Sequence, residues 1–419
     1  MRKKIIVRAP ALSRSGYGEQ ARFAIRALRT REDLFDVYII NIPWGSTGQT
    51  LSDSSEALYI REKIRKTAVY MQQANTEFDI SLQVTIPNEF QKMAHVDVGY
   101  TAGIETTKVS PQWIDKCNAI VDKLIVVSEH SKKVFEQTKY AVQDENGNQH
   151  HNWGLSKPVE VVNYAVRPST PEPIEINLTT TKNFLTVAQW GPRKNLENTI
   201  GWFVQEFKDD ETVGLVVKTN TASDSVIDRE HTAARLQKLL SQIGEYKCKV
   251  YLVHGELPEG ALTWLYQHPT MHGFINIAHG EGYGLPLFEA AYNGLPLVTM
   301  SWSGQMDFIC KPNKKGKKVP LISKVDYNLD KVQTSAVWAG VIQEDSMWAY
   351  AKEKSYKRAL RECLTKRKYC LERATSLKKH LLENFTEEKK HAEFVNSLYP
   401  EESRLEMEAE IDDLLADLL

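Results

Sequence analysis

Short apolar stretches alternate with longer amphipathic stretches along most of the chain. The apolar stretches predict buried β-strands, because a strand that is covered on both faces is apolar throughout. They fall at residues 4–9, 35–40, 123–128, 184–187, 213–217, 249–253, 274–277 and 297–298. Apolar positions at helical spacing follow several of them, as at 19–29 and at 129–135, where Ser128 is the predicted N-cap. We therefore predict an α/β fold with parallel sheets that are covered by helices on both faces.

The length of the chain predicts two domains. Its 419 residues exceed what one hydrophobic core usually supports, and its 42% apolar content is enough for two cores. The segment 167–173 contains three prolines and few residues that favour helices or strands, which makes it the predicted interdomain linker. The first domain is therefore expected over residues 1–170, with the second beginning at residue 171.

Composition narrows the possible partners and compartments. The formal net charge of −1 gives no overall field that would attract nucleic acid or an anionic membrane, although local patches stay open. The chain has no apolar run of about 18 residues, and the start MRKKIIVRAP is too short for a signal peptide, so we expect a soluble, cytoplasmic protein without a transmembrane segment. The five cysteines lack metal-ligand spacing, and Cys363 and Cys370 are predicted to lie on one helix, too far apart for a disulfide.

The most informative segment is the glycine-rich loop after the predicted strand at 274–277. Glu281 stands in this loop, Pro286 is placed for the first turn of a helix, and Glu289 follows about one turn later. Free N–H groups and the helix dipole at such a helix start favour a phosphate or diphosphate. Carboxylates on either side can accept hydrogen bonds from hydroxyls, so the segment predicts a nucleotide-sugar site. A structural glycine turn followed by a solvated glutamate is the alternative interpretation.

The sequences EGYGLP and EAAYNGLPLV, which begin at Glu281 and Glu289, resemble the E-x7-E donor motif of the retaining GT-B glycosyltransferases (glycosyl transferases group 1, family four). The resemblance implies two Rossmann-like domains that face each other across a cleft, and transfer with retention at the anomeric carbon. It assigns Glu281 to the sugar hydroxyls and Glu289 to the nucleotide ribose. The backbone amides that it places against the sugar and phosphates belong to Gly282, Tyr283, Gly284 and Leu285.

Cations follow the predicted strand at 184–187. Arg193 offers a planar guanidinium and Lys194 a point charge, and both types of group stabilise a departing diphosphate. The resemblance assigns Lys194 to the donor phosphates; Gln189 stands where many family members carry an arginine, and Arg193 is the candidate substitute. Lys218, at the end of another predicted strand, is a further candidate for phosphate binding. Because these cations would balance the charge of the diphosphate, the resemblance implies no metal and no cofactor. Solvated basic residues are the alternative interpretation.

A second glycine loop, with Gly16 and Gly18, follows the first predicted strand. The resemblance places it against the donor phosphate from the other side of the cleft. GYGEQA also fits the GxGxxA dinucleotide pattern, which makes an NAD-dependent oxidoreductase an alternative. Against that alternative, the glycines lie seven or more residues beyond the strand, and Asn41 stands where an acid would bind a ribose. Further along, Glu105 is a candidate for sugar or acceptor contact, or else a solvated carboxylate.

The second half of the chain also contains a predicted returning helix, a lysine-rich loop and a tail. The resemblance implies a second domain over residues 171–375 and a C-terminal helix, residues 376–400, that returns to the first domain. Lysine occupies five of the eight positions from Lys311 to Lys318, a loop that either is solvated or meets a phosphate-rich or nucleic-acid acceptor. Residues 401–419 read as an acidic amphipathic tail, of which 405–419 either frays or binds a partner protein or a second copy.

We therefore predict a glycosyltransferase that moves a sugar from a nucleotide sugar, with a UDP-sugar as the expected donor. The acceptor is a hydroxyl of a glycan, lipid, protein or modified nucleobase. Two alternatives stay open: the oxidoreductase, and a catalytically silent sugar-nucleotide-binding assembly protein.

Overall fold

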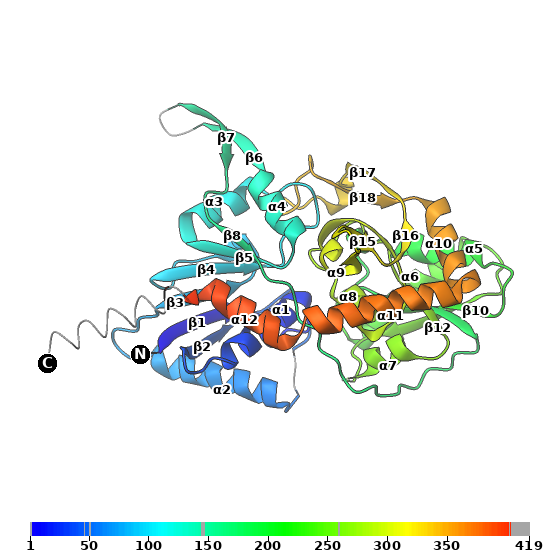
Figure 1. Ribbon diagram of the computed structural model, residues 1–419, viewed down its shortest axis with the longest axis horizontal. Coiled ribbons are helices and arrows are strands. Elements are labelled where there is room, and N and C mark those ends of the chain that lie inside the picture. Colours follow the sequence, from blue (N-terminus) through cyan, green and yellow to red (C-terminus); the bar gives the residue numbers. More distant parts are fainter. Residues whose placement is uncertain are drawn as a thin grey trace.

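The computed structural model describes residues 2–45, 47–49, 52–143, 147–258, 260–401 and 403. Its architecture rests on two parallel six-stranded sheets, each covered by helices and lying side by side in Figure 1. This confirms the predicted α/β class with two Rossmann-like domains. The predicted interaction of residues 405–419 falls outside the described residues.

The N-terminal sheet has the strand order β2-β1-β3-β4-β5-β8. Its strands and the segments between them are β1 (Lys3–Ala9), α1 (Gly16–Arg29), β2 (Phe35–Asn41), α2 (Ser55–Tyr70), β3 (Ile80–Val84), the 3₁₀ turn η1 (Pro87–Glu89), β4 (Val96–Thr101), α3 (Pro111–Ile120), β5 (Lys123–Val126), α4 (Glu129–Gln137) and β8 (Val159–Val161). An antiparallel hairpin of β6 (Lys139–Gln143) and β7 (Gln149–Gly154) projects from this domain at the top of Figure 1. Ser128 caps α4 as predicted, since its side chain accepts from the Ser131 amide.

The C-terminal sheet has the order β11-β10-β9-β12-β13-β16. Its first elements are β9 (Lys182–Val187), η2 (Pro192–Lys194), α5 (Leu196–Glu206), β10 (Val213–Thr219), α6 (Val226–Ser241), β11 (Lys249–His254), α7 (Ala261–Gln267), β12 (Met271–Asn276), α8 (Leu285–Asn293) and β13 (Leu297–Met300). Next come η3 (Ser303–Gln305), α9 (Met306–Ile309), the hairpin strands β14 (Cys310–Pro312) and β15 (Lys318–Pro320), and β16 (Ser323–Val325). From β9 the chain first adds β10 and β11 on one side, and then returns to add β12 and β13 on the other side, so the strand order reverses between the neighbours β9 and β12. Ligands of open parallel sheets bind beyond the carboxyl ends of the strands at such a reversal.

Two helices carry the chain back to the first domain. After α10 (Glu353–Thr365), α11 (Arg367–Asn384) packs along the second domain, and α12 (Glu387–Leu398) packs against α1 of the first. The rings of Phe394 and Phe23 meet edge to face with centroids 5.7 Å apart at the α12–α1 contact. Residue 375, the predicted end of the second domain, lies within α11, and Phe385 and Thr386 connect α11 to α12.

A crossing arm also joins the domains. It comprises residues 327–351 and contains the antiparallel strands β17 (Tyr327–Lys331) and β18 (Met347–Ala351), with the turn η4 (Thr334–Ala336) between them. The arm leaves the second domain and packs on the first, where Val341 is buried within an N-terminal core cluster. The Thr107 amide donates to the Met347 carbonyl at 3.0 Å, and Asn88 Nδ2 donates to the Gly340 carbonyl at 3.2 Å.

Cys363 and Cys370 lie on two different helices, α10 and α11. The helical stretch around Cys363 and Cys370 breaks at Lys366, so the two thiols approach the same hydroxyl, Ser323 Oγ, at 3.5 and 3.6 Å. The prediction that both lie on one helix was therefore wrong.

Among the described helices, none is long and apolar enough to cross a membrane.

Candidate functional site

A cleft of about 670 Å³ opens at the reversal point of the C-terminal sheet and is lined by both domains. The loops after β9 and β12 supply Arg193, Lys194 and Glu281 to it, while α1 supplies its first residue, Gly16. Parallel strands end at the same edge of their sheet, so loops more than eighty residues apart in the chain meet here.

Glu281 is the centre of the polar contacts in this cleft. Lys194 Nζ lies 2.7 Å from Glu281 Oε1 and 2.8 Å from Oε2, and Arg193 Nη1 donates to Oε2 at 2.9 Å. Asn276 Nδ2 donates to Oε1 at 3.1 Å, and the Glu281 amide donates to Ser303 Oγ at 2.9 Å. The carboxylate therefore holds two cations at fixed positions beside the glycine loop.

The electrostatics follow from this arrangement. Burial alone would raise the pKa of Glu281, but the charges of Lys194 and Arg193 outweigh it and lower the pKa to about 2. Burial, followed by the charge of Arg193, lowers the pKa of Lys194. Glu281 and Glu105, whose Oε1 lies 3.4 Å from Arg193 Nη2, balance the charges of the two cations, so an anionic ligand would have to share Lys194 and Arg193 with these carboxylates.

The glycine loop approaches the first domain closely. A β-carbon at Gly280 would lie 1.9 Å from the Glu105 carbonyl oxygen, and one at Gly282 would lie 2.4 Å from the Ala102 carbonyl oxygen. Gly284 adopts a φ of 96°, in the left-handed region that glycine enters at little cost, and directly precedes α8. No side chain among the described residues caps that helix start, and Leu285 and Pro286 line the cleft. The start of α8, whose first amides lack a side-chain cap, therefore lies at the cleft.

Glu289 lines a neighbouring hollow of about 990 Å³, which shares Lys218 and Leu285 with the cleft. Tyr266 Oη donates to Glu289 Oε2 at 2.9 Å. Burial raises the pKa of Glu289 to about 7, although the bond from Tyr266 acts in the opposite direction. For the amine of Lys218, burial acts in the other direction and lowers the pKa, because it disfavours the charged form. The two predicted carboxylates thus lie in adjoining hollows with Lys218 between them.

The N-terminal candidates divide into two kinds. Gly16 and Glu105 line the cleft, and Glu105 Oε1 lies 3.4 Å from Arg193 Nη2 across the domain boundary. Gly18 lies inside the first turn of α1, where its amide donates to Ser15 Oγ at 3.0 Å. A β-carbon at Gly18 would lie 1.9 Å from the Ser13 carbonyl oxygen, so close packing accounts for this glycine.

Several lining residues were not singled out from the sequence. Tyr17, Trp44, Asp224 and Trp338 line the cleft, and Asn276 bonds to Glu281. Trp44 and Asn276 carry a usable signal, because polar or aromatic residues that end or follow a strand of a parallel sheet face the ligand edge. Trp338 carries no such signal, since the crossing arm alone brings it to the first domain.

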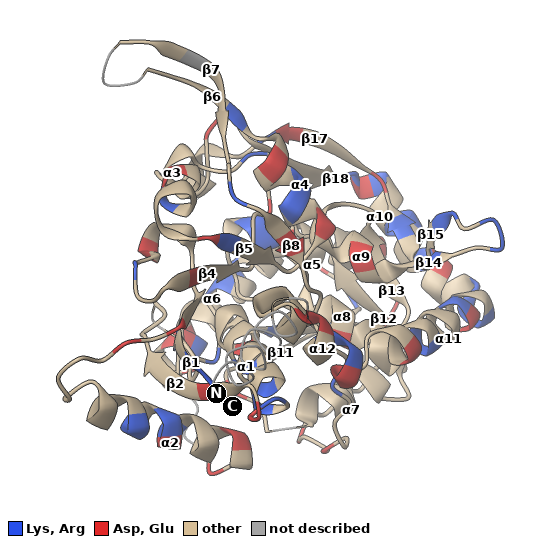
Figure 2. Ribbon diagram, turned by 60° about the vertical axis from the view of Figure 1, so that its left-hand side comes forward, with Lys and Arg blue, Asp and Glu red and all other residues tan. Residues whose placement is uncertain are grey.

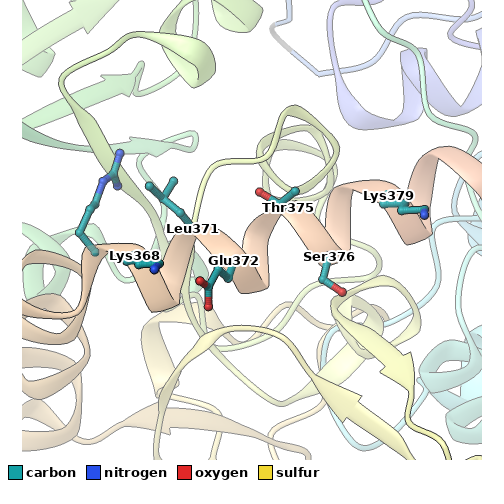
Figure 3. A pocket seen from close by; sticks show the side chains of 7 residues that line it. Lys368, Leu371, Glu372, Thr375, Ser376 and Lys379 are labelled. Carbon is teal, nitrogen blue, oxygen red and sulfur yellow. The ribbon is translucent and has the colours of Figure 1, made fainter.

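Two other surface features lie outside the cleft lining. The lysine-rich turn between β14 and β15 projects as a blue hairpin in Figure 2. A separate hollow runs along α11 between Arg367 and Lys379 (Figure 3). Its lining side chains all come from that one helix, so it resembles a surface groove more than an enclosed site. Among the described residues, no group of three or more metal-ligating side chains is arranged around a common point.

No protein-family model and no curated protein sequence matches the chain. Several solved structures match the chain by fold. HepE of Anabaena, in complex with UDP and glucose, aligns with a TM-score of 0.57 at 11% identity, over 95% of this chain and 99% of that one. Sucrose-phosphate synthase of Thermosynechococcus elongatus aligns with a TM-score of 0.57 at 13% identity, over 99% and 100%. The α,α-trehalose 6-phosphate synthase of Burkholderia multivorans gives 0.54 at 10% identity, over 95% and 98%.

The chain has the GT-B fold. Both of its sheets, the cleft between them and the returning helix α12 are covered by alignments that span nearly the whole of the chain. In this GT-B protein, the cluster of Glu281, Lys194 and Arg193 and the start of α8 all lie at the reversal point of the C-terminal sheet.

Proposed function

We propose that this protein is a retaining glycosyltransferase that uses a UDP-sugar and transfers the sugar to a hydroxyl of an acceptor. The observation that carries the proposal is the pair of cations, Lys194 and Arg193, held by Glu281 beside the start of α8. Cations and free amides at one point match the charge and the hydrogen-bonding needs of a diphosphate. HepE, one of the aligned structures, holds UDP and glucose, which supports UDP as the nucleotide.

The donor would extend from the cleft into the neighbouring hollow. Its diphosphate would lie against Lys194, Arg193 and the amides of the glycine loop. Glu289 would accept hydrogen bonds from the ribose hydroxyls, because it stands one turn further along α8 in the adjoining hollow. The sugar would face Glu281, whose carboxylate also fixes the two cations. Lys218 lines both hollows and would contribute charge near the phosphates.

Catalysis would depend on positioning and on stabilising the leaving group. The acceptor oxygen forms a bond to the anomeric carbon on the face from which UDP departs, and the bond from that carbon to the phosphate oxygen breaks. The departing phosphate oxygen takes the proton of the acceptor hydroxyl. Lys194, Arg193 and the start of α8 balance the charge that develops on UDP, the task that a divalent metal performs in other transferases.

The oxidoreductase alternative receives less support from the geometry. In a dinucleotide site the glycine turn directly follows the first strand, whereas α1 begins seven residues after β1 ends. In addition, close packing and a cap bond occupy Gly18. The silent-protein alternative would keep the same donor site and differ only in turnover.

A thermal-shift panel tests the proposal. It contains uridine, guanosine and adenosine diphosphates, their common sugar conjugates, and NAD, each with the wild type and Glu289→Ala. A ligand at a hundred times its dissociation constant adds about 2.7 kcal/mol of stability, which moves the melting temperature by a few degrees. We expect UDP and one UDP-sugar to stabilise the wild type and to stabilise Glu289→Ala less. Stabilisation by NAD alone would overturn the proposal.

Turnover and stereochemistry need a second measurement. The stabilising UDP-sugar is incubated with the protein in chelator, and UDP release and the anomeric proton of the product are followed by NMR. We expect release without added metal and a product with the anomeric configuration of the donor. Binding without release, over an acceptor panel, would favour the silent protein.

A further inference from the structure

The mouth of the cleft carries two tryptophans, one from each domain. Trp44 comes from the segment after β2, and Trp338 comes from the crossing arm of the second domain. Both line the same cleft as Glu281 and Lys194. The donor contacts proposed above use neither of them, so their role must be sought on the acceptor side of the cleft.

Trp44 lies on a fixed aromatic support. Its ring centroid lies 4.3 Å from that of Tyr17, with 36° between the ring planes. Tyr17 Oη shares a hydrogen bond of 2.7 Å with Thr101 Oγ1 and accepts from the Ala102 amide at 3.3 Å. Because the phenol is held at its polar end and the indole packs on its ring, the N-terminal wall is an ordered aromatic surface.

Trp338 is exposed although its backbone is held. Its side chain is 60% exposed, while Val341, three residues later, is only 8% exposed within the N-terminal core cluster. The Trp338 carbonyl accepts from the amides of Val341 at 2.9 Å and Ile342 at 2.8 Å. An anchored turn therefore presents a large apolar ring at the edge of a polar cleft, an arrangement typical of a ligand contact.

The donor contacts proposed above use the cations Lys194, Arg193 and Lys218 of the cleft, and its other lining groups include carboxylates and amides. Glu105 and Asp224 line the cleft from opposite domains, and Gln189 lines it as well. A β-carbon at Gly48, in the first domain, would lie 3.6 Å from Oδ2 of Asp224, in the second domain, so the two domains approach each other closely here. Arg14, a cation at this mouth, is paired with Glu256.

We propose that Trp338 and Trp44 form the acceptor subsite and that the acceptor group which binds there is a neutral sugar ring. This inference rests on the proposed function and adds the class of acceptor. The apolar C–H face of a pyranose can pack on an indole while its hydroxyls donate to carboxylates at the rim. A phosphate-bearing strand would bring its charges against Glu105 and Asp224, and the lysine-rich turn after β14 does not line this cleft.

The experiment measures UDP release from the UDP-sugar identified by the donor panel. The acceptor probes are methyl α- and β-glucosides, methyl galactosides, maltotriose and cellotriose, with a single-stranded oligonucleotide containing hydroxymethylcytosine as the charged probe. The variants are Trp338→Ala, Trp338→Phe and Trp44→Ala. We expect at least one neutral glycoside to accelerate release. In Trp338→Ala its KM should rise roughly tenfold more than the KM for the UDP-sugar, and Trp338→Phe should recover most of the loss.

The matched control is Tyr369→Ala, which removes a 49% exposed aromatic side chain on α11, outside the cleft lining. It should leave both KM values within twofold of the wild type. Equal glycoside KM values in Trp338→Ala and the wild type would overturn the inference, as would acceleration by the oligonucleotide alone or by none of the probes. Slow hydrolysis of the UDP-sugar without acceptor reports on the wild-type donor site separately, so failure of the acceptor inference is distinguishable from failure of the proposed function.

Discussion

Arg193 Nη2 lies 3.4 Å from Glu105 Oε1, and this ion pair joins the second domain to the first directly beside Glu281. The same guanidinium donates through Nη1 to Glu281 Oε2 and to the Gly280 carbonyl. One side chain therefore links the cation cluster, the glycine loop and the opposite domain. A change in the distance between the domains should consequently alter the cluster as well.

Substitution of Gly280 by alanine tests this dependence. The new β-carbon would lie 1.9 Å from the Glu105 carbonyl oxygen, and backbone on both sides of the contact must move to relieve the clash. We expect Gly280→Ala to lower kcat/KM for the UDP-sugar by about 10- to 100-fold, because misplaced reacting groups lose positional catalysis. Gly191→Ala is the matched control, since nothing lies within 4 Å of its β-carbon position. Similar activity in the two variants would show that the close approach does not matter for catalysis.

The order of importance among the cations is a second prediction. Lys194 contacts both oxygens of Glu281, whereas Lys218 lines the cleft from a strand end. We expect Lys194→Met to lower kcat by about 100-fold or more, since charge-assisted bonds to a leaving group are worth about 2 to 4 kcal/mol. Lys218→Met should cost less, and Lys314→Met, on the exposed hairpin turn, should cost nothing measurable. Steady-state kinetics of UDP release checks the ranking; a larger loss in Lys218→Met would reverse it.

The sequence predicted the sheets better than the connections between domains. Each predicted strand of the second domain overlaps one of β9 to β13, because buried parallel strands are continuously apolar and the pattern is local. The crossing arm was not predicted. Its strands β17 and β18 are partly exposed, and Val341 packs in a core whose other buried residues lie more than 180 residues earlier in the chain. Such long-range packing leaves no periodic signal.

The candidate site shows the same contrast. Motif and cation spacing led to Glu281, Lys194 and Arg193, which the structure brings within hydrogen-bonding distance. Spacing alone did not reveal that Glu281 forms ion pairs with Lys194 and Arg193, because these contacts depend on the ends of β9 and β12 lying side by side. Gly18 illustrates the opposite case, because a glycine in a recognisable pattern is explained by packing against Ser13.

The pairing of Glu281 with two cations leads to a third prediction. Glu281→Gln leaves Lys194 and Arg193 without their common carboxylate, which should cost about 2 kcal/mol of unfolding free energy, less than a fully buried pair because both cations are partly exposed. UDP can replace the missing negative charge. We therefore expect UDP to raise the melting temperature of Glu281→Gln more than that of the wild type, while sugar transfer falls by at least 100-fold. An equal or smaller UDP shift in the variant would contradict this account.

The raised pKa of Glu289 predicts how stability and donor binding depend on pH. Burial brings this pKa to about 7, above the value of about 4.5 in the unfolded chain, so the native state binds the extra proton between these values. The stabilisation is complete below about pH 4.5 and is lost as pH rises through 7. Since solvent partly reaches this side chain, we expect the wild type to lose about 1 to 2 kcal/mol relative to Glu289→Gln across this window.

Urea unfolding of both proteins at half-unit pH steps measures that difference, and Glu372→Gln, on the exposed face of α11, is the control that should follow the wild type. Donor binding should change in the opposite direction. The carboxylate accepts stronger hydrogen bonds from ribose hydroxyls than the protonated acid does, so UDP affinity of the wild type should increase between pH 6 and 8. Glu289→Gln cannot ionise, and its UDP affinity should stay lower with a flatter pH profile. If the UDP affinities of the wild type and Glu289→Gln changed in parallel with pH, ionisation of Glu289 would not be the cause of the change. That result would contradict the assignment of Glu289 to the ribose.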